Sequence, residues 1–228
     1  MIMTDGEIKA ALKAGQLKIS NFAEDCLEAA GYDARIGKHL QRAGDSKEFD
    51  LESEGSVEIR AGEFFLFTTR EEFALPLDIS GHLGPKSYFT YRGLVLLCGQ
   101  HIDPGFSGVL VLGGYNASPR SVVLEFEEQI CNVEFHHLSR PVEKAPREYP
   151  DHAQGHLPRE VKDYIRGLTG APLYELTQTV SGLASSVQTL SANVQTLSTV
   201  TYKVVLPILG SIFAGMVLTL LSVWLKHQ

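Results

Sequence analysis

The chain has 228 residues, of which 44% are apolar, so it is long enough to bury a core of one or two domains. A formal net charge of −7 argues against binding to a nucleic-acid backbone, because such proteins are normally basic. The cysteines lack a CxxC pattern, which is typical of reduced thiols in a cytosolic protein, and no apolar secretion signal opens the chain. They are Cys26, Cys98 and Cys131.

The N-terminal part predicts one short helix followed by strands. Thr4-Asp5-Gly6-Glu7 has the pattern of a capping box, which predicts a helix through about Ala14. Short β-rich runs broken by Gly, Pro and Asp then occupy 57–73, 101–116 and 121–135. Such runs predict an all-β sandwich or barrel.

Residues 141–170 are polar and rich in proline, which predicts a loop or lid and then a linker. A strict heptad repeat of Leu and Val follows and predicts a coiled coil over 171–203. An amphipathic helix packed on its own head is the alternative interpretation. The remaining positions are mostly Ser, Thr, Gln and Ala, so no charged pairs define the partner or the register. The a and d positions are Leu173, Leu176, Val180, Leu183, Val187, Leu190, Val194 and Leu197.

Residues 204–225 carry no charge and are flanked by Lys203 and Lys226. As a helix they would extend about 33 Å, which exceeds the roughly 30 Å of a bilayer core. A buried helix of a large protein is the alternative, although the segment is long and ends the chain. We therefore expect a single-pass C-terminal tail anchor with a cytoplasmic head. One lysine at each end leaves the orientation undecided by the positive-inside rule.

Four stretches of the head together resemble the dCTP deaminase branch of the trimeric dUTPase superfamily. Each is weak alone, but their order and spacing over roughly residues 4–158 make a specific match. The resemblance implies a mainly β, jelly-roll-like subunit that forms a homotrimer, with nucleotide sites shared between neighbouring subunits. The stretches are GYDARIG (31–37), AGEFFLFTTREEFALP (61–76), PKSYFTYRGL (85–94) running into HIDPGFSG (101–108), and EEQICNVEF (127–135).

The resemblance assigns candidate nucleotide-binding residues. Asp-Pro-Gly by itself would make Asp103 a turn residue. In the family the matching carboxylate contacts the deoxyribose 3′-OH, and in dUTPases it is the general base, so Asp103 is the candidate for that role. Phe106 matches an aromatic ring beneath the sugar. Lys86 and Ser87 match a pair that contacts the phosphates.

Three further residues complete the implied nucleotide site. Asn132 stands where the family usually has glutamine, and Gln154 and Gly155 match part of a C-terminal lid over the triphosphate. The histidines lack cysteines or clustered carboxylates at ligand spacing, so no protein-held metal site is expected. Mg²⁺ would arrive with a triphosphate, held mainly by phosphate oxygens and water.

The chain departs from the deaminase pattern at the residues that carry the chemistry. Gly113 occupies the position of the glutamate that shuttles protons at the cytosine ring. Tyr88 and Tyr91 stand where deaminases have a second serine and an arginine, and Arg92 is one residue away, which in a strand would place it on the other face. A zinc-deaminase motif is also missing. The pattern indicates a retained pocket and lost deamination.

Two functional hypotheses remain. The first is a membrane-anchored, catalytically reduced sensor that binds a deoxynucleoside triphosphate, with anti-phage defence as a context suggested by architecture alone. The second is an active dCTP deaminase or a dUTPase-like pyrophosphatase that uses Asp103. In both, the expected organisation is a nucleotide-binding head (1–146), a lid and linker (147–170), a stalk (171–203) and a transmembrane helix (204–225).

Overall fold

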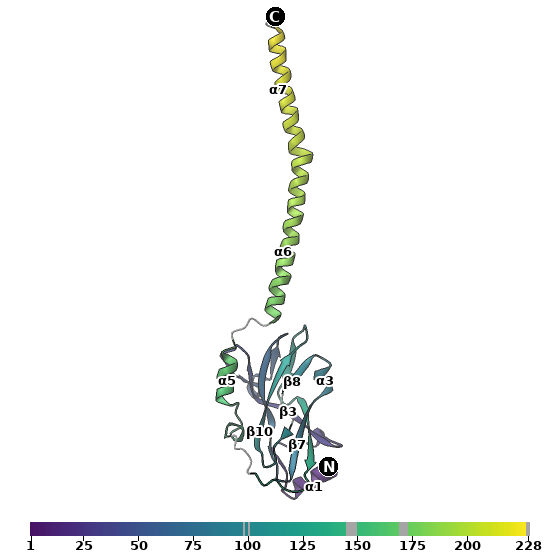
Figure 1. The fold of residues 1–228 in the computed structure, drawn as a ribbon, viewed down its shortest axis with the longest axis vertical. Coiled ribbons are helices and arrows are strands. Elements are labelled where there is room, and N and C mark those ends of the chain that lie inside the picture. The colour runs from purple at the N-terminus through teal and green to yellow at the C-terminus, as the bar shows by residue number, and fades with distance from the viewer. Residues whose placement is uncertain (98, 100, 145–149, 169–172, 227–228) are drawn as a thin grey trace. The chain divides into compact units, whose positions relative to one another are not determined.

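The computed structural model describes every residue except 98, 100, 145–149, 169–172 and 227–228. It divides into two compact units, Met1–Tyr174 and Glu175–Gln228. The first unit is mainly β and the second is helical (Figure 1). Each unit is described separately below.

The first unit contains twelve strands among its described residues, all in antiparallel pairs. Its helices are short and lie before, between or after the strands. In chain order the elements are α1 (Asp5–Lys13), β1 (Lys18–Ile19), η1 (Glu24–Cys26), β2 (Leu27–Glu28), β3 (Gly31–Arg42), β4 (Phe49–Asp50), α2 (Leu51–Glu54), β5 (Ser56–Ile59), β6 (Phe64–Ala74), β7 (Ile79–Pro85), α3 (Ser87–Thr90), β8 (Leu94–Leu97), β9 (His101–Ile102), β10 (Ser107–Asn116), β11 (Val122–Glu125), β12 (Gln129–His137), α4 (Pro150–Ala153) and α5 (Arg159–Arg166).

The predicted N-terminal helix is confirmed as α1. The Thr4 hydroxyl accepts a hydrogen bond from the backbone N–H of Glu7 at 3.4 Å. The Glu7 carboxylate in turn accepts one from the backbone N–H of Thr4 at 2.8 Å. This reciprocal pair satisfies two N–H groups that the helix itself leaves unpaired, so the helix begins at Asp5.

The predicted β-rich runs are also confirmed. Ten of the strands form one curled sheet in the order β8-β10-β6-β3-β12-β7-β9, with β1, β2 and β4 paired beside this path. Strands β5 and β11 form a separate pair. Irregularities in the register, such as the one between Val109 and Val111, interrupt the long strands and allow the sheet to bend.

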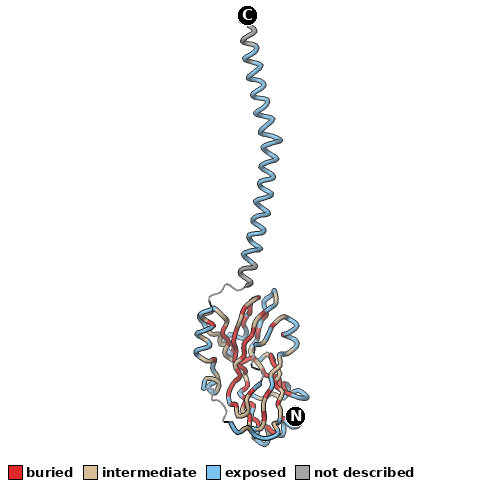
Figure 2. Tube along the Cα trace, in the orientation of Figure 1, coloured by how far each residue is buried: buried red, intermediate tan, exposed pale blue. Residues whose placement is uncertain are grey.

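The core lies between the layers of this curled sheet, where the strands are most deeply buried (Figure 2). Aromatic side chains fill much of it, and Cys26 and Cys131 are buried there. The third cysteine, Cys98, lies outside the described residues. The largest aromatic members of the core are Tyr32, Phe65, Phe67, Phe73, Phe89 and Phe135.

The segment expected to be a loop and linker contains two helices. Helices α4 and α5 fall within 141–170, and α5 lies against the outside of the sheet (Figure 1). Leu157 and Ile165 are buried against Leu66 of β6, so an apolar contact determines where this segment lies. Such a contact depends on tertiary packing and leaves no periodic pattern in a segment this short.

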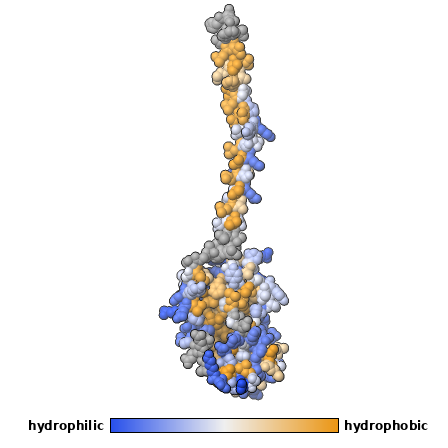
Figure 3. All heavy atoms as spheres, in the orientation of Figure 1, coloured by the Kyte–Doolittle hydropathy of each residue, from blue (hydrophilic) through white to orange (hydrophobic). Residues whose placement is uncertain are grey.

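One long helix makes up the second unit and begins two residues before it; it runs through α6 (Leu173–Val200), a π-helical turn η2 (Thr201–Val205) and α7 (Leu206–Lys226). Apolar residues line one side of α6 and polar residues the other (Figure 3). By length and composition, one helix among the described residues is apolar enough to cross a membrane. The described heptad residues are all more than half exposed, and they are Val180, Leu183, Val187, Leu190, Val194 and Leu197. The coiled coil itself stays a prediction.

The packing of β10 yields a stability prediction. A Cβ added at Gly114 would overlap the ring of Phe65, whereas a Cβ at Gly84 would have no atom within 4 Å. Gly114→Ala should therefore destabilise the head by about 1–3 kcal/mol through overpacking. Gly84→Ala, the matched control, should change stability by less than about 0.5 kcal/mol. Urea denaturation of the detergent-solubilised protein, followed by tyrosine fluorescence, measures both; equal midpoints would contradict the packing.

Candidate nucleotide site

A pocket of about 170 Å³ lies beside the turn that joins β9 to β10. The backbone N–H of Phe106 donates to the carbonyl oxygen of Asp103 at 3.1 Å, and Gly105 has a φ of +80°. Asp103-Pro104-Gly105-Phe106 is thus the turn that the sequence predicts, with glycine at the position requiring positive φ. Asp103 and Phe106 also line the pocket, so the turn and site interpretations are compatible.

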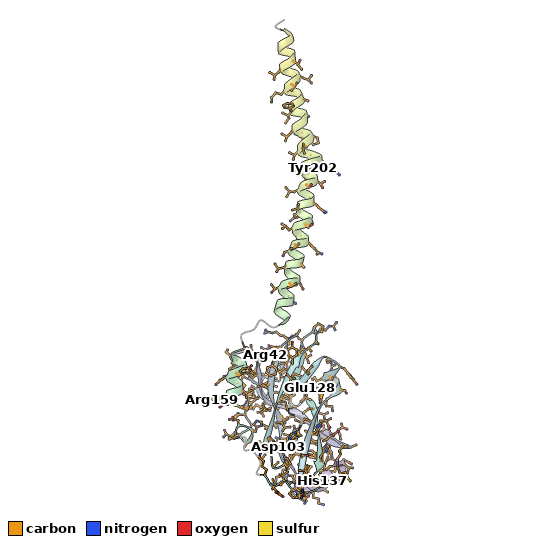
Figure 4. All side chains as sticks on the ribbon, viewed as in Figure 1. Arg42, Asp103, Glu128, His137, Arg159 and Tyr202 are labelled. Carbon is orange, nitrogen blue, oxygen red and sulfur yellow. The ribbon has the colours of Figure 1, made fainter. Side chains whose placement is uncertain are left out.

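Asp103 is paired with a histidine that the sequence did not single out. The Asp103 Oδ1 atom lies 3.1 Å from His101 Nε2, and both side chains line the pocket while remaining about half exposed or more. A histidine bonded to a carboxylate is oriented by it and can exchange a proton with water. Figure 4 labels Asp103 within the head. The sequence pattern that could have indicated this pair is the His–x–Asp spacing at the end of a strand, because alternate residues of a strand lie on the same face.

Phe106 and His152 form another part of the pocket. Phe106 is buried, and its ring meets the ring of His152 edge to face, with centroids 5.9 Å apart and planes at 88°. The Nδ1–H of His152 donates to the carbonyl oxygen of Val109 at 2.9 Å. In the neutral ring this bond leaves Nε2 as an acceptor. His152 comes from α4, which the sequence placed in a loop.

Lys86 and Asn132 meet at a different place, around the buried carboxylate of Asp33. Lys86 Nζ donates to Asp33 Oδ2 and, at 3.0 Å, to Gln129 Oε1. Asn132 Nδ2 donates to Asp33 Oδ1 at 3.0 Å. A buried carboxylate requires such partners, because desolvation of an unpaired charge is costly. Lys86 and Asn132, both predicted to face the phosphates, are therefore already bonded to Asp33, which balances the charge of the lysine. Ser87 follows Lys86 as the first residue of α3 and is exposed.

Strand register explains why these residues meet. Strand β12 lies between β3 and β7, and Asn132 is opposite both Asp33 and Gly84. Lys86 then leaves the end of β7 next to this row. Asp33 and Gln129 were absent from the sequence-based site, although Asp33 lies within the GYDARIG stretch. Only the register of three strands shows that this carboxylate faces Lys86.

Gln129 extends the same network to a thiol. Its side-chain N–H donates to the sulfur of Cys26 at 3.4 Å, while its oxygen accepts from Lys86. Burial raises the pKa of Cys26, and this outweighs the hydrogen bond from Gln129. Cys26 is therefore a protonated, unreactive group at neutral pH and serves as packing.

The two clusters do not meet within one chain. Gly81 of β7 is opposite Ile102 of β9, so Asp103 lies near this point of the strand. Lys86 is five residues further along, which corresponds to about 16 Å at the rise of a β-strand. A single nucleotide site that uses both Lys86 and Asp103 would thus need residues from more than one chain or a long ligand.

The two glycines of β10 are packed from both directions. A Cβ at Gly113 would lie 3.0 Å from the carbonyl oxygen of Leu97 and 3.3 Å from the ring of Phe64. Gly114 faces the opposite side and lies against Phe65. Neighbouring strands thus approach β10 closely at both positions, and no ionisable side chain is present where the deaminase pattern has its glutamate.

The segment after Lys86 is helical, so the strand geometry considered for Arg92 does not apply. Residues 87–90 form α3, and Arg92 follows in a turn. The Arg92 guanidinium lies 3.4 Å from the centroid of the Tyr88 ring as a cation–π contact. Tyr91 is largely exposed.

The residues predicted to belong to a lid lie at the end of α4. Gln154 is exposed, and its backbone N–H donates to the carbonyl oxygen of Pro150 at 3.1 Å. Gly155 has a φ of +75°, which lets the chain turn from α4 toward Leu157. Across the described residues, no three His, Cys, Asp or Glu side chains are grouped as metal ligands.

Comparison with known proteins gives the family. Residues 2–138 match the family model described as dCTP deaminase-like. The dCTP deaminase of Pyrococcus abyssi (strain GE5 / Orsay) is 35% identical over 147 residues, covering 64% of this chain and 90% of that protein. The dUMP-forming dCTP deaminase of Corynebacterium kroppenstedtii is 30% identical over 159 residues, covering 63% of this chain and 85% of that protein. The chain belongs to the dCTP deaminase-like family.

The fold agrees with this assignment. The crystal structure of 2′-deoxycytidine 5′-triphosphate deaminase from Agrobacterium tumefaciens superposes with a TM-score of 0.50 at 23% identity. The match covers 59% of this chain and 47% of that one, and it shows a shared fold. The family match ends at residue 138, so α4 to α7 lie beyond it.

The buried Asp33 carboxylate yields a testable coupling. Lys86→Met should destabilise the head by about 1–3 kcal/mol, because it leaves Asp33 buried without its cation. Asp33→Asn combined with Lys86→Met should recover more than half of that loss, since the charge is then absent. Urea denaturation of both single variants and the double variant completes the cycle. Strictly additive effects would mean that the two side chains are not energetically coupled.

Proposed function

We propose that this protein is a membrane-anchored member of its family that acts as a sensor. It binds a deoxynucleoside triphosphate and has reduced or no deaminase activity. The observation that carries the proposal is Gly113, where a glycine is closely packed by Leu97 and Phe64. Loss of a general acid or base commonly slows a reaction by about 10²–10⁴-fold. Binding needs no such group, and the pocket at Asp103 and Phe106 is present.

The proposed ligand site is shared between copies of the chain. Its two halves, around Asp103 and around Lys86, lie at opposite ends of β7, and a homotrimer of the family type would bring them together across an interface. Phe106 would lie beneath the sugar and disfavour a ribose 2′-OH. Lys86, Ser87 and Asn132 would face the phosphates, and Gln154 and Gly155 would complete the lid.

Mg²⁺ would accompany the triphosphate. The described residues contain no cluster of ligands for a dedicated cation cage, and the Asp33 carboxylate is already bonded to Lys86 and Asn132. This donor set fits an ion that is held by phosphate oxygens and water. When bound, the ion would neutralise phosphate charge.

The C-terminal helices support the membrane part of the proposal. We infer that α7 anchors the protein by one pass with the head in the cytosol, and that α6 forms a coiled-coil stalk. The exposed apolar stripe of α6 would be buried against other copies. A ligand that favours one arrangement of the heads would then shift the stalk and the membrane helices, as an anti-phage effector requires.

A second candidate function is a nucleotide pyrophosphatase. The observation in its favour is the hydrogen-bonded pair of His101 and Asp103 beside the pocket. Asp103 would accept a proton from the attacking water, and His101 would orient the carboxylate. This chemistry does not need the missing glutamate at position 113, whereas deamination of dCTP does.

Activity and binding assays distinguish these functions. We expect the full-length protein in detergent to bind a dNTP more tightly than the matching ribonucleotide, with Lys86→Ala and Phe106→Ala weakening binding. We expect no dUTP or dUMP from dCTP at a rate typical of the family. Calorimetry and product chromatography with dCTP, dUTP, dTTP and CTP provide the measurements. Rapid deamination that Asp103→Asn abolishes would contradict the sensor, and pyrophosphate release would support the second function.

The assembly can be tested separately. We expect a trimer, because the head interface should bury far more surface than a stalk without charged e and g positions. Val at a with Leu at d favours dimers in an isolated coiled coil, so the two parts predict different states. Mass measurement of the detergent-solubilised protein, with and without residues 171–228, decides between them. A dimer in the shortened protein would contradict the shared site.

A further inference from the structure

The helix of the second unit changes its winding between the predicted stalk and the predicted membrane segment. The π-helical turn η2 lies between α6 and α7, and the three together form one continuous helix. At the end of η2 the backbone N–H of Leu206 donates to the carbonyl oxygen of Thr201, five residues earlier, whereas an α-helix uses the fourth residue. Tyr202, which Figure 4 labels, lies in this turn. Single π turns within α-helices are rare and frequently lie at functional sites.

A proline explains why the turn lies at this point of the chain. Pro207 is the second residue of α7 and has no backbone N–H to donate. In an α-helix its ring would also crowd the carbonyl group four residues earlier, that of Lys203 in η2. Local π geometry is one of the adjustments that accommodate proline in membrane helices. The position of η2 therefore follows from the local sequence.

The π turn changes which side of α7 continues a given side of α6. A π turn holds one residue more than an α-helical turn. Consecutive residues of an α-helix are about 100° apart around its axis, so every residue after η2 is rotated by about 100° relative to an unbroken α-helix. The side of α7 that continues the apolar stripe of α6 is then occupied by residues one position later in the chain.

This shift of one residue selects large apolar side chains. The last heptad positions of α6 are Val194 and Leu197. Without a shift, the same spacing would reach a mixed set of residues in α7, namely Ile208, Ser211, Gly215 and Leu218. With the shift it reaches Leu209, Ile212 and Met216, which we call the shifted face. All three side chains are more than half exposed in the single chain.

The handedness of helix packing favours the shifted face over the small residues of α7. Heptad-spaced apolar residues form left-handed supercoils, and most membrane bundles share that hand, with crossing angles of about +20°. Small residues four apart, such as Gly210 and Ala214, instead suit right-handed crossings of about −40°. Because α6 continues directly into α7, helices that leave a left-handed stalk enter the membrane with a left-handed crossing. Gly210 and Ala214 lie on the side of α7 opposite Ile212.

We propose that the shifted face is the surface by which α7 contacts further copies of this chain in the membrane, and that η2 holds this face in phase with the stalk. The partner is another copy, because parallel copies carry identical stripes at identical heights, so that α6 and α7 meet their counterparts together. The inference rests on the stalk and the anchor of the proposed function and is independent of the nucleotide. A rotation of the stalk would thus reach the membrane helices with a fixed phase.

The test is a cysteine scan of α7 in the full-length protein, reconstituted in lipid bilayers. One cysteine at a time replaces each residue from 208 to 216, a thiol oxidant is added, and the covalently linked fraction is measured on denaturing gels. The unmodified chain, with its own cysteines, gives the background. We expect maxima for Leu209→Cys, Ile212→Cys and Met216→Cys, and background values for Gly210→Cys and Ala214→Cys. Maxima one position earlier, or equal linkage at every position, would overturn the proposal.

Deletion of Tyr202 tests the role of η2 in the same scan. The deletion removes the extra residue, so an unbroken α-helix then presents the shifted face on the side of the stalk stripe. We expect the maxima to stay at Leu209, Ile212 and Met216, in the numbering of the intact chain. Maxima that move by one position when Tyr202 is deleted would mean that η2 does not shift the phase of the intact helix.

Two cysteines in α6 separate failure of this inference from failure of the stalk. Leu190 is a heptad core position, and Ala192 lies on the outer side of the same turn. We expect Leu190→Cys to cross-link and Ala192→Cys to remain at background. Absence of linkage at Leu190 would overturn the stalk of the proposed function and this inference with it. Linkage at Leu190 without the expected pattern in α7 would overturn this inference alone.

Discussion

The buried carboxylate of Asp33 is the constraint on which much of the head depends. A carboxylate at 2% exposure is stable only with partners, and here they come from separate strands and from the start of α3. Lys86 and Asn132 are therefore held by this carboxylate at the point where β12 lies between β3 and β7. The residues that the family pattern assigns to phosphate binding are thus part of the structural framework, and their role at a ligand would come in addition to it.

A second constraint is the close approach of other elements to β10. This strand is glycine-rich where β6, β8 and α4 approach it; a Cβ would overlap its neighbours at Gly108 and Gly114 and would be tightly packed at Gly113. Gly113 and Gly114 are packed by strands, and Gly108 is covered by α4. Gly113, where the deaminase pattern has its glutamate, and the contact with α4 thus lie on the same strand.

The pocket combines side chains from the sheet with one from a short helix. The sheet and its turn supply Asp103 and Phe106 in a rigid setting, while His152 comes from a short helix held by separable contacts. Elements held by few contacts open at lower free energy than a sheet core, so they are suited to respond to a ligand. Under the proposed function, binding would persist without deamination, because holding a nucleotide requires no proton transfer.

The sequence by itself determined the helix at the N-terminus, the β-rich head, its family resemblance and the long apolar helix, because each rests on local periodicity, capping or ordered motifs. Asp103 and Phe106 share one turn, so their common position beside the pocket follows from the local sequence. Only the tertiary structure decided that Asp33 faces Lys86, that His101 pairs with Asp103, and that His152 reaches the pocket from a segment expected to be a loop. Strand register and the docking of α4 and α5 create those contacts between residues far apart in the chain. Such contacts depend on side-chain packing across elements, for which a linear pattern carries no signal.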